Sequence, residues 1–158
     1  MDEKTLVAIL VPLGFLVGFP LIWIGVCQLS AFVSGWRALA SRYRATTPLP
    51  GKRIEAPRSQ IGFSQYRNAL TAHVSPEGLG LSVSSMFPGH APLLFPWSDL
   101  HDVRSYRPLI GKPGVTFRVG PVSGPLSKTF YIPAAVFEHP DVPPAIRAVA
   151  AAPQARTA

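Results

Sequence analysis

An uninterrupted apolar run near the start of the chain limits what this sequence can fold into. Residues 6–33 form a stretch of 28 residues without a charged side chain. As a helix rising about 1.5 Å per residue, the run would extend roughly 42 Å, against about 30 Å for the hydrocarbon core of a bilayer. The sequence therefore predicts a transmembrane helix over residues 6–33, whose surplus length must tilt, bend or emerge from the bilayer.

The charges that flank this run predict its orientation. Residues 1–5 include Asp2 and Glu3, whereas the residues that follow the run are rich in arginine. Flanks rich in lysine and arginine stay cytoplasmic. We therefore expect a single-pass protein of the inner or plasma membrane, with residues 1–5 outside the cell and the remainder in the cytoplasm.

The same region allows a second interpretation. Ala38-Leu39-Ala40 has the small-x-small form of a signal-peptidase site, and cleavage near Ala40 would release an exported β domain of unknown activity. The apolar run is, however, well beyond the roughly 7 to 15 residues usual in a signal peptide. Cys27 is the only cysteine, so an intrachain disulfide is impossible and the redox compartment is not indicated.

Small residues within the run suggest a third hypothesis. Gly14 and Gly18 form a GxxxG pair, a spacing that lets a second helix approach closely. On this hypothesis the chain is a structural subunit of a membrane complex, a homodimer or an assembly with another membrane protein. Pro12 and Pro20 interrupt helix hydrogen bonding and predict bends.

Residues 34–45 have the periodicity of an amphipathic helix. Trp36, Leu39, Ala40 and Tyr43 recur at i, i+3, i+4 and i+7, which places them on one face. That face either lies at the headgroups, where Trp and Tyr are enriched, or packs on the domain that follows. The residues we expect at the membrane interface are Trp36, Arg37, Arg42, Tyr43, Arg44, Lys52 and Arg53.

Proline and glycine divide the rest of the chain into short segments. Residues 46–58 form an expected linker, residues 59–151 a β domain, and residues 152–158 a disordered tail. The turn residues Ser75-Pro76-Glu77-Gly78 predict a hairpin. Six or seven strands are expected, followed by short helices. The strands are expected at 59–64, 68–75 and 79–83, within 87–96 after a loop, and at 102–107, 115–119 and 126–132, and the helices at 133–138 and 144–151.

This order predicts an α+β, mainly β chain, with the transmembrane helix followed by a small antiparallel sandwich or partly open barrel and a C-terminal helix. Glu77-Gly78-Leu79-Gly80-Leu81-Ser82, and Leu94-Phe95-Pro96-Trp97-Ser98-Asp99-Leu100 followed by Val103, resemble motifs of bacterial pleckstrin-homology-like and GRAM-like domains. The resemblance covers residues 59–138 and implies a membrane-anchored binding or scaffolding module. Pro140, Pro143 and Pro144 depart from the single long closing helix of that fold.

Chemistry-bearing residues are sparse. Residues 46–158 contain six acids, and only His101, beside Asp102 and near Asp99, resembles a metal or general-base cluster. Motifs for a serine nucleophile or a phosphate-binding loop are absent. We therefore predict no enzymatic activity, no cofactor and no metal.

Basic residues in the expected strands and turns suggest an anionic partner instead. They could form a patch that meets lipid headgroups, although a solvated face is the plainer interpretation. Aromatic and basic residues do not alternate as they do in RNA-binding sheets, so we expect no nucleic acid. The residues of this predicted patch are Arg104, Arg107, Lys112, Arg118 and Lys128.

Overall fold

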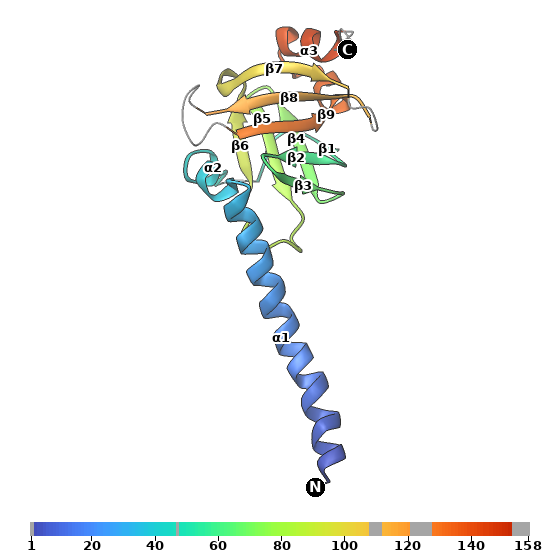
Figure 1. Ribbon diagram of the computed structural model, residues 1–158. Coiled ribbons are helices and arrows are strands. Elements are labelled where there is room, and N and C mark those ends of the chain that lie inside the picture. The colour runs from blue at the N-terminus through green and yellow to red at the C-terminus, as the bar shows by residue number, and fades with distance from the viewer. Residues whose placement is uncertain (1, 47, 108–111, 121–127, 153–158) are drawn as a thin grey trace.

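The computed structural model describes residues 2–46, 48–107, 112–120 and 128–152. One long helix leads into two antiparallel sheets, and a short helix lies at the far end of the molecule (Figure 1). The described part of the chain is therefore α+β and mainly β, and its sheets do not close into a barrel. The expected fold class is confirmed to this extent.

The two sheets are built from nine short strands in the described residues. The four-stranded sheet has the order β1-β4-β5-β6, with β1 (Lys52–Glu55), β4 (Leu70–Ser75), β5 (Gly78–Val83) and β6 (Leu93–Pro96). The five-stranded sheet has the order β3-β2-β9-β8-β7, with β3 (Ser64–Tyr66), β2 (Ser59–Ile61), β9 (Lys128–Pro133), β8 (Gly114–Val119) and β7 (Leu100–Tyr106). The helical segments are α1 (Glu3–Val33), α2 (Trp36–Tyr43), η1 (Trp97–Asp99), η2 (Ala134–Glu138) and α3 (Pro144–Ala151).

The core lies between the two sheets. Alternation along the strands turns the apolar side chains inward, and the Phe130 ring meets Phe95 of the other sheet at 5.4 Å and Phe117 of its own sheet at 5.1 Å between centroids. Phe137 of η2 closes one end against Phe117. All four rings are fully buried, so the sheets form one sandwich core.

The predicted hairpin is present, and two strands were missed. Ser75 pairs with Gly78 across a two-residue loop in the β4–β5 hairpin. The single strand expected at 59–64 is instead the β2–β3 hairpin, because Gly62 takes a φ of 57° and reverses the chain. β1 lies inside the expected linker and was missed because only Ile54 of its four residues is apolar.

α2 belongs to the core of the domain. Trp36, Leu39 and Tyr43 are buried, and the Trp36 indole N–H donates to the Ala91 carbonyl at 2.8 Å. The prediction that Trp36 and Tyr43 lie among lipid headgroups is wrong, because the same aromatic face packs on the sheets. The domain accordingly includes residues 34–45 and does not begin at residue 59.

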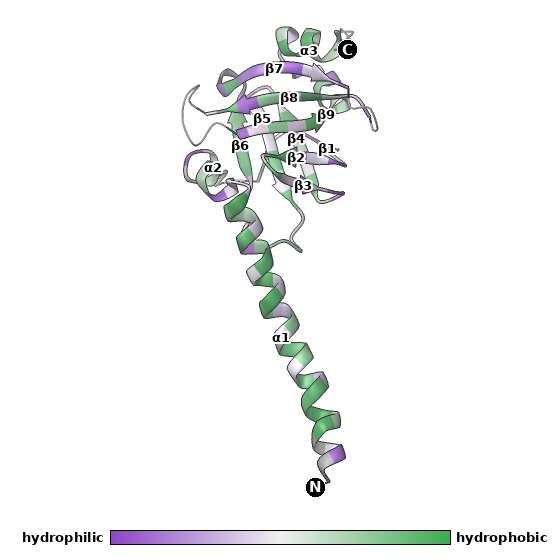
Figure 2. Ribbon diagram, viewed as in Figure 1, coloured by the Kyte–Doolittle hydropathy of each residue, from purple (hydrophilic) through white to green (hydrophobic). Residues whose placement is uncertain are grey.

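α1 continues unbroken through Pro12 and Pro20, and at about 1.5 Å per residue its 31 residues extend roughly 46 Å. Residues 7–33 are apolar enough to cross a membrane or to act as a signal sequence, and Figure 2 shows hydrophobic residues along most of the helix. In the part of the helix that precedes Trp23, the described apolar side chains are exposed. Cys27 and Ala31, which follow Trp23, are buried against the domain. The helix therefore has a free portion and a docked portion.

A cluster of four side chains joins the docked portion to the domain; we call it the junction cluster. It consists of Ser34, Trp36, Tyr66 and His90. The Tyr66 hydroxyl lies 3.3 Å from the Ser34 Oγ and 3.1 Å from the His90 Nε2, and the Trp36 ring packs edge-on against His90 at 5.2 Å. Burial raises the pKa of Tyr66 and lowers that of His90, so both rings favour their neutral forms in this cluster.

The turn between α1 and α2 depends on Gly35. Its φ of 78° is left-handed, and a Cβ there would lie 2.6 Å from the Lys128 Cε. The Lys128 side chain thus crosses directly over the turn. Glycine lets the chain change direction beside Lys128, the first residue of β9.

Candidate anion-binding groove

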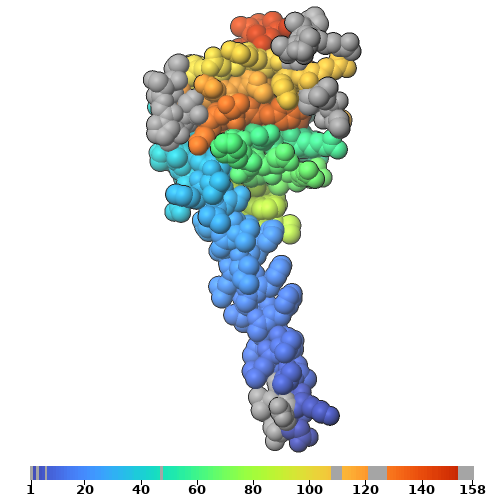
Figure 3. Space-filling model, viewed as in Figure 1, coloured from blue at the N-terminus to red at the C-terminus, as the bar shows by residue number. Residues whose placement is uncertain are grey.

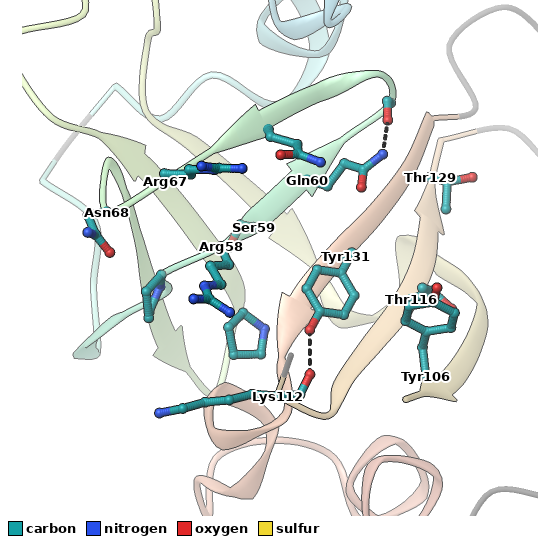
Figure 4. Close-up of a pocket in the computed structure, with 14 residues that line it drawn as sticks. Arg58, Ser59, Gln60, Arg67, Asn68, Tyr106, Lys112, Thr116, Thr129 and Tyr131 are labelled. Atoms are coloured by element: carbon teal, nitrogen blue, oxygen red, sulfur yellow. Dashed lines mark hydrogen bonds between the residues drawn. The ribbon is translucent and has the colours of Figure 1, made fainter. Parts of the chain in front are cut away.

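A groove of about 970 Å³ lies on the outer face of the five-stranded sheet (Figure 4). Its floor comes from outward-facing residues of β2, β8 and β9, which alternate with core residues along each strand. Its walls come from the two connections that carry the chain between the sheets, β1–β2 and β3–β4. The residues labelled in Figure 4 are Arg58, Ser59, Gln60, Arg67, Asn68, Tyr106, Lys112, Thr116, Thr129 and Tyr131.

The charges in the groove are all positive. Arg58, Arg67 and Lys112 line it, and none of the fourteen lining residues carries a carboxylate or an imidazole. Amide and hydroxyl groups from Gln60, Thr129 and their neighbours supply neutral hydrogen-bonding groups. A concave surface with three cations and no acid is suited to an anion, because guanidinium groups bind phosphate and carboxylate oxygens with two parallel N–H donors.

Tyr131 forms the centre of the floor. Its hydroxyl donates to the Lys112 carbonyl at 2.8 Å, and its ring meets Tyr106 edge-on at 5.8 Å. Burial raises its pKa, Tyr106 adds to the rise, and the neighbouring Arg58 lowers it, with a net rise. The phenol thus stays neutral and adds no negative charge to the groove.

Backbone geometry brings two residues into the groove wall. Arg58 and Asn68 have φ values of 61° and 52°, and each stands where the chain passes from one sheet to the other. The left-handed conformation costs about 1–2 kcal/mol for a residue such as arginine, whereas asparagine tolerates it better. Strained residues of this kind cluster at functional sites, which supports a role for Arg58.

The five cations of the predicted patch do not gather in one place. Only Lys112 lines the groove. Arg118 lies 3.9 Å from the Asp102 carboxylate, and the Lys128 side chain covers Gly35 at the junction with α1. Arg104 and Arg107 are exposed on and just after β7, outside the groove. Arg104 and Arg118 pair in register with Thr116 and Thr129, which line the groove. Whether the five residues act together on one anionic ligand stays a prediction.

The sequence did not reveal the two arginines that matter most here. Arg58 fell inside the expected linker, and Arg67 was not considered. Each stands beside a turn residue, in Pro57-Arg58 and in Arg67-Asn68. Two arginines at turns on either side of one short hairpin were the available signal, because a hairpin brings its two ends together.

The cationic members of the predicted membrane-interface set remain on the surface. Arg37, Arg44, Lys52 and Arg53 are exposed on or near α2 and β1. Arg42 lies 3.8 Å from the Asp99 carboxylate and above the ring of Tyr43. Whether any of them meets lipid stays a prediction.

The histidine cluster considered from the sequence does not assemble. A β-bulge lies between His101 and Arg104, and Asp102 takes a φ of 50° there. Its carboxylate pairs with Arg118 and not with His101. In the ranges that the structure describes, no three His, Cys, Asp or Glu side chains come together in a way that could hold a metal ion.

A second hollow, of about 650 Å³, lies on the outer face of the four-stranded sheet. It shares Pro57 and Asn68 with the groove, but its lining includes Glu55 as well as Arg53. Burial lowers the pKa of His73 in its floor, with a further contribution from Arg53. Because this hollow carries both positive and negative side chains, it favours an anionic ligand less than the groove does.

Comparisons with known proteins add no family to this description. The chain matches no protein-family model, no curated protein and no solved structure. The resemblance to pleckstrin-homology-like and GRAM-like domains therefore stays a prediction.

Proposed function

We propose that this protein is a single-pass membrane protein whose cytoplasmic β domain is a non-catalytic binding module, with the cationic groove as the site for an anionic ligand. The observation that carries the proposal is the joint between α1 and the domain. Cys27 and Ala31 of the apolar helix, and Ser34 directly after it, are buried against the domain, so the anchor and the module form one folded unit.

The same joint counts against the exported alternative. Cleavage near Ala40 would remove Trp36 and Leu39, which are buried to 0% and 1% exposure in the domain core. Loss of a buried tryptophan alone costs about 3–5 kcal/mol, a large part of the 5–15 kcal/mol that typically stabilises a whole domain. An uncleaved anchor therefore agrees better with the fold.

The lining of the groove supports the non-catalytic part of the proposal. Its lining has no carboxylate or imidazole to act as a general acid or base. The Ser59 hydroxyl is buried and donates to the Ala56 carbonyl at 2.8 Å, which leaves it poorly placed to act as a nucleophile.

Topology is tested with reporters fused after Ala158. We expect alkaline phosphatase to be inactive there, a fluorescent protein to be fluorescent, and the chain to keep its full length in membranes. Active phosphatase on a chain shortened near Ala40 would overturn the membrane-anchored proposal in favour of export.

Ligand binding is tested on the full chain in nanodiscs of zwitterionic lipid, with inorganic pyrophosphate as a soluble probe and phosphatidylglycerol-containing nanodiscs as the lipid arm. Because a hydrogen bond to a charged group contributes about 1.5–3 kcal/mol, Arg58→Gln and Arg67→Gln should each weaken binding by roughly tenfold or more. Arg107→Gln, outside the groove, is the matched control. Binding of neither probe, or an equal loss in the control, would contradict the assignment of the groove.

A further inference from the structure

The connection between β5 and β6, residues 84–92, leaves the sheets and runs down beside α1; we call it the β5–β6 loop. Figure 1 shows it descending alongside the helix, and in Figure 3 its yellow-green atoms lie against the helix below the rest of the domain. The Trp23 indole N–H donates to the Met86 carbonyl at 2.8 Å, and the Trp23 and Phe87 rings lie 5.6 Å apart. The tip of the loop therefore reaches the level of Trp23.

The loop is held in this place at two further points. At Gly89, with a φ of 95°, a Cβ would lie 2.8 Å from the Gln28 side chain, so the loop backbone approaches α1 closely there. The His90 Nε2 atom shares a hydrogen bond with the Tyr66 hydroxyl, and the His90 Nδ1 atom lies 3.3 Å from the Phe87 carbonyl oxygen. The junction cluster thus connects the loop, α1 and β3.

The composition of the loop differs from that of an ordinary surface loop. It contains no Asp, Glu, Lys or Arg. The Met86 side chain at its tip is 71% exposed, although methionine is usually buried. An uncharged loop that presents an apolar side chain beside a membrane anchor is suited to the boundary between headgroups and hydrocarbon.

The number of helical residues needed to cross the hydrocarbon core agrees with this placement of the loop. Lys4 is the last charged residue before the apolar run, and about 20 helical residues, or roughly 30 Å, cross the hydrocarbon core. Counting from Lys4 therefore reaches Trp23 and Ile24. Tryptophan itself is enriched at that boundary, so the count, the residue type and the loop contact indicate the same level.

A boundary at Val33, the end of the apolar run, conflicts with the loop. The loop tip would then lie about 15 Å inside the hydrocarbon, ten helical residues below the surface. Lipid-exposed irregular backbone does not occur at such depth, because its N–H and C=O groups would lack partners. The folded loop thus excludes the full apolar run as the spanning segment.

We propose that the β5–β6 loop is a second membrane contact, which lays Met86 and Phe87 in the bilayer interface beside Trp23 and sets the hydrocarbon boundary there. The proposal rests on the proposed function, because it requires α1 to span a bilayer. The loop and the helix together then fix the domain in both height and rotation, which one helix alone would leave free.

This placement also bears on the ligand of the groove. Gly62, which lines the groove, lies near the Ser34 carbonyl, where a Cβ would be 3.7 Å away. Ser34 is eleven residues above Trp23, roughly 16 Å along the helix axis. The polar region of one leaflet is only about 5–8 Å thick. The groove thus opens above the headgroups, which favours a water-soluble anion over a lipid of the same membrane.

The test uses single cysteines labelled with an environment-sensitive fluorophore, in the full chain with Cys27→Ala, reconstituted into nanodiscs. The sites are Met86→Cys in the loop, Ser98→Cys on the exposed η1 turn as the aqueous control, and Val17→Cys in the middle of α1 as the membrane control. Lipids that carry a quencher near the headgroup or deep in the acyl chain report depth, and iodide reports exposure to water.

We expect emission from Met86→Cys to be blue-shifted relative to Ser98→Cys and quenched most strongly by the headgroup-level quencher. Adding Trp23→Phe, which removes the indole donor, should move the signal toward that of Ser98→Cys. If iodide quenches Met86→Cys as strongly as Ser98→Cys, or if the deep quencher acts on it as on Val17→Cys, the loop proposal is overturned. If Val17→Cys itself is quenched by iodide and not by lipid, the anchor fails, which would overturn the proposed function as well.

Discussion

The two portions of α1 look alike in sequence and differ completely in their surroundings. Up to Ile22 the described apolar side chains face outward on every side of the helix, with exposures such as 68% at Phe15 and 71% at Leu16. From Trp23 onward one side is covered, with Cys27 at 2% and Ala31 at 0%. From residue 6 to residue 33 neither portion carries a charge, so hydropathy alone treats them as one segment.

The difference shows that one apolar run can combine a portion with an exposed apolar surface and a portion that packs in a protein core. The first portion exposes apolar side chains around its whole circumference, as a helix surrounded by lipid does. The second portion uses one side as part of a protein core and continues through Gly35 into α2, whose Trp36, Leu39 and Tyr43 complete that core. Excess length over a bilayer is then the part of the helix that docks, and tilting is not needed to explain it.

Trp36→Ala should have the largest effect on this arrangement. The side chain is fully buried and donates to Ala91, and a Trp-to-Ala change in a core costs about 3–5 kcal/mol. We expect urea unfolding of the full chain in detergent micelles, followed by near-ultraviolet circular dichroism, to shift by that amount. Leu16→Ala in the free portion is the control and should leave the domain unchanged. Equal losses in the two variants would contradict the burial of α2 in the domain core and favour its placement at the membrane interface.

The same substitution in both portions gives a closer comparison. Ala31→Leu adds bulk where the side chain is fully buried, and overpacking typically costs about 1–3 kcal/mol. Ala8→Leu adds the same atoms at an exposed position of the free portion and should leave domain stability within experimental error. Unfolding measured as for Trp36→Ala separates the two, and a neutral Ala31→Leu would show that α1 does not dock on the domain.

Much of the domain followed from the sequence because its strands carry strong local signals. The alternation at Leu79 and Leu81 and the Pro76-Glu77 turn gave β4 and β5 nearly at their observed bounds. The docked side of α1 could not be predicted, because an alanine and a cysteine within an apolar helix have no periodicity that separates core from lipid. The groove was also hidden, since its arginines come from two connections that only the paired sheets bring together.

The expected tail beyond residue 152 lies outside the described residues, as does the first part of the strand expected at 126–132. Within the described part, the break at Pro140, Pro143 and Pro144 was anticipated correctly. η2 ends at Glu138, and α3 begins again at Pro144. Proline lacks the N–H that would continue a helix, which explains why this element could be predicted from composition alone.

Tyr43 offers a pH test of the docked portion. Burial and its hydrogen bond to the Asp99 carboxylate, 2.7 Å long, raise the pKa of Tyr43 from 10.0 to about 12. An acid whose pKa is higher in the folded state stabilises the fold while it is protonated. Its contribution is therefore complete below about pH 10 and is lost as the pH rises toward 12.

We expect Tyr43→Phe to flatten the fall in stability between pH 10 and 12, measured by urea unfolding at each pH. Asp99→Asn, which removes the carboxylate that accepts the Tyr43 hydrogen bond, should flatten the same fall in part. An identical pH profile in the wild-type chain and in Tyr43→Phe would mean that α2 does not hold Tyr43 against Asp99.

Substitutions at Gly14 and Gly18, in the free portion of α1, should have the smallest effect on stability. These glycines instead bear on whether two copies of the chain associate. Apart from chain neighbours and the nearby backbone of α1 itself, no atom of the described chain lies within 4 Å of a Cβ built at either glycine. Nine residues separate Gly18 from Cys27, which at about 100° per residue puts them on opposite sides of α1. Leu29 and Phe32, exposed to 62% and 69%, continue the glycine side upward. Self-association through this side would leave the docked face untouched.

Disulfide crosslinking in membranes, in a Cys27→Ala background, tests this side directly. If a second copy packs there, Gly14→Cys and Gly18→Cys should give covalent dimers, because GxxxG packing brings the two backbones close together. Leu16→Cys, about 200° around the helix from Gly14, is the matched control and should stay monomeric. Dimers from all three sites would indicate random collision, and dimers from none would remove the structural-subunit hypothesis. In either case domain unfolding should be unchanged, because the free portion contributes no side chain to the domain core.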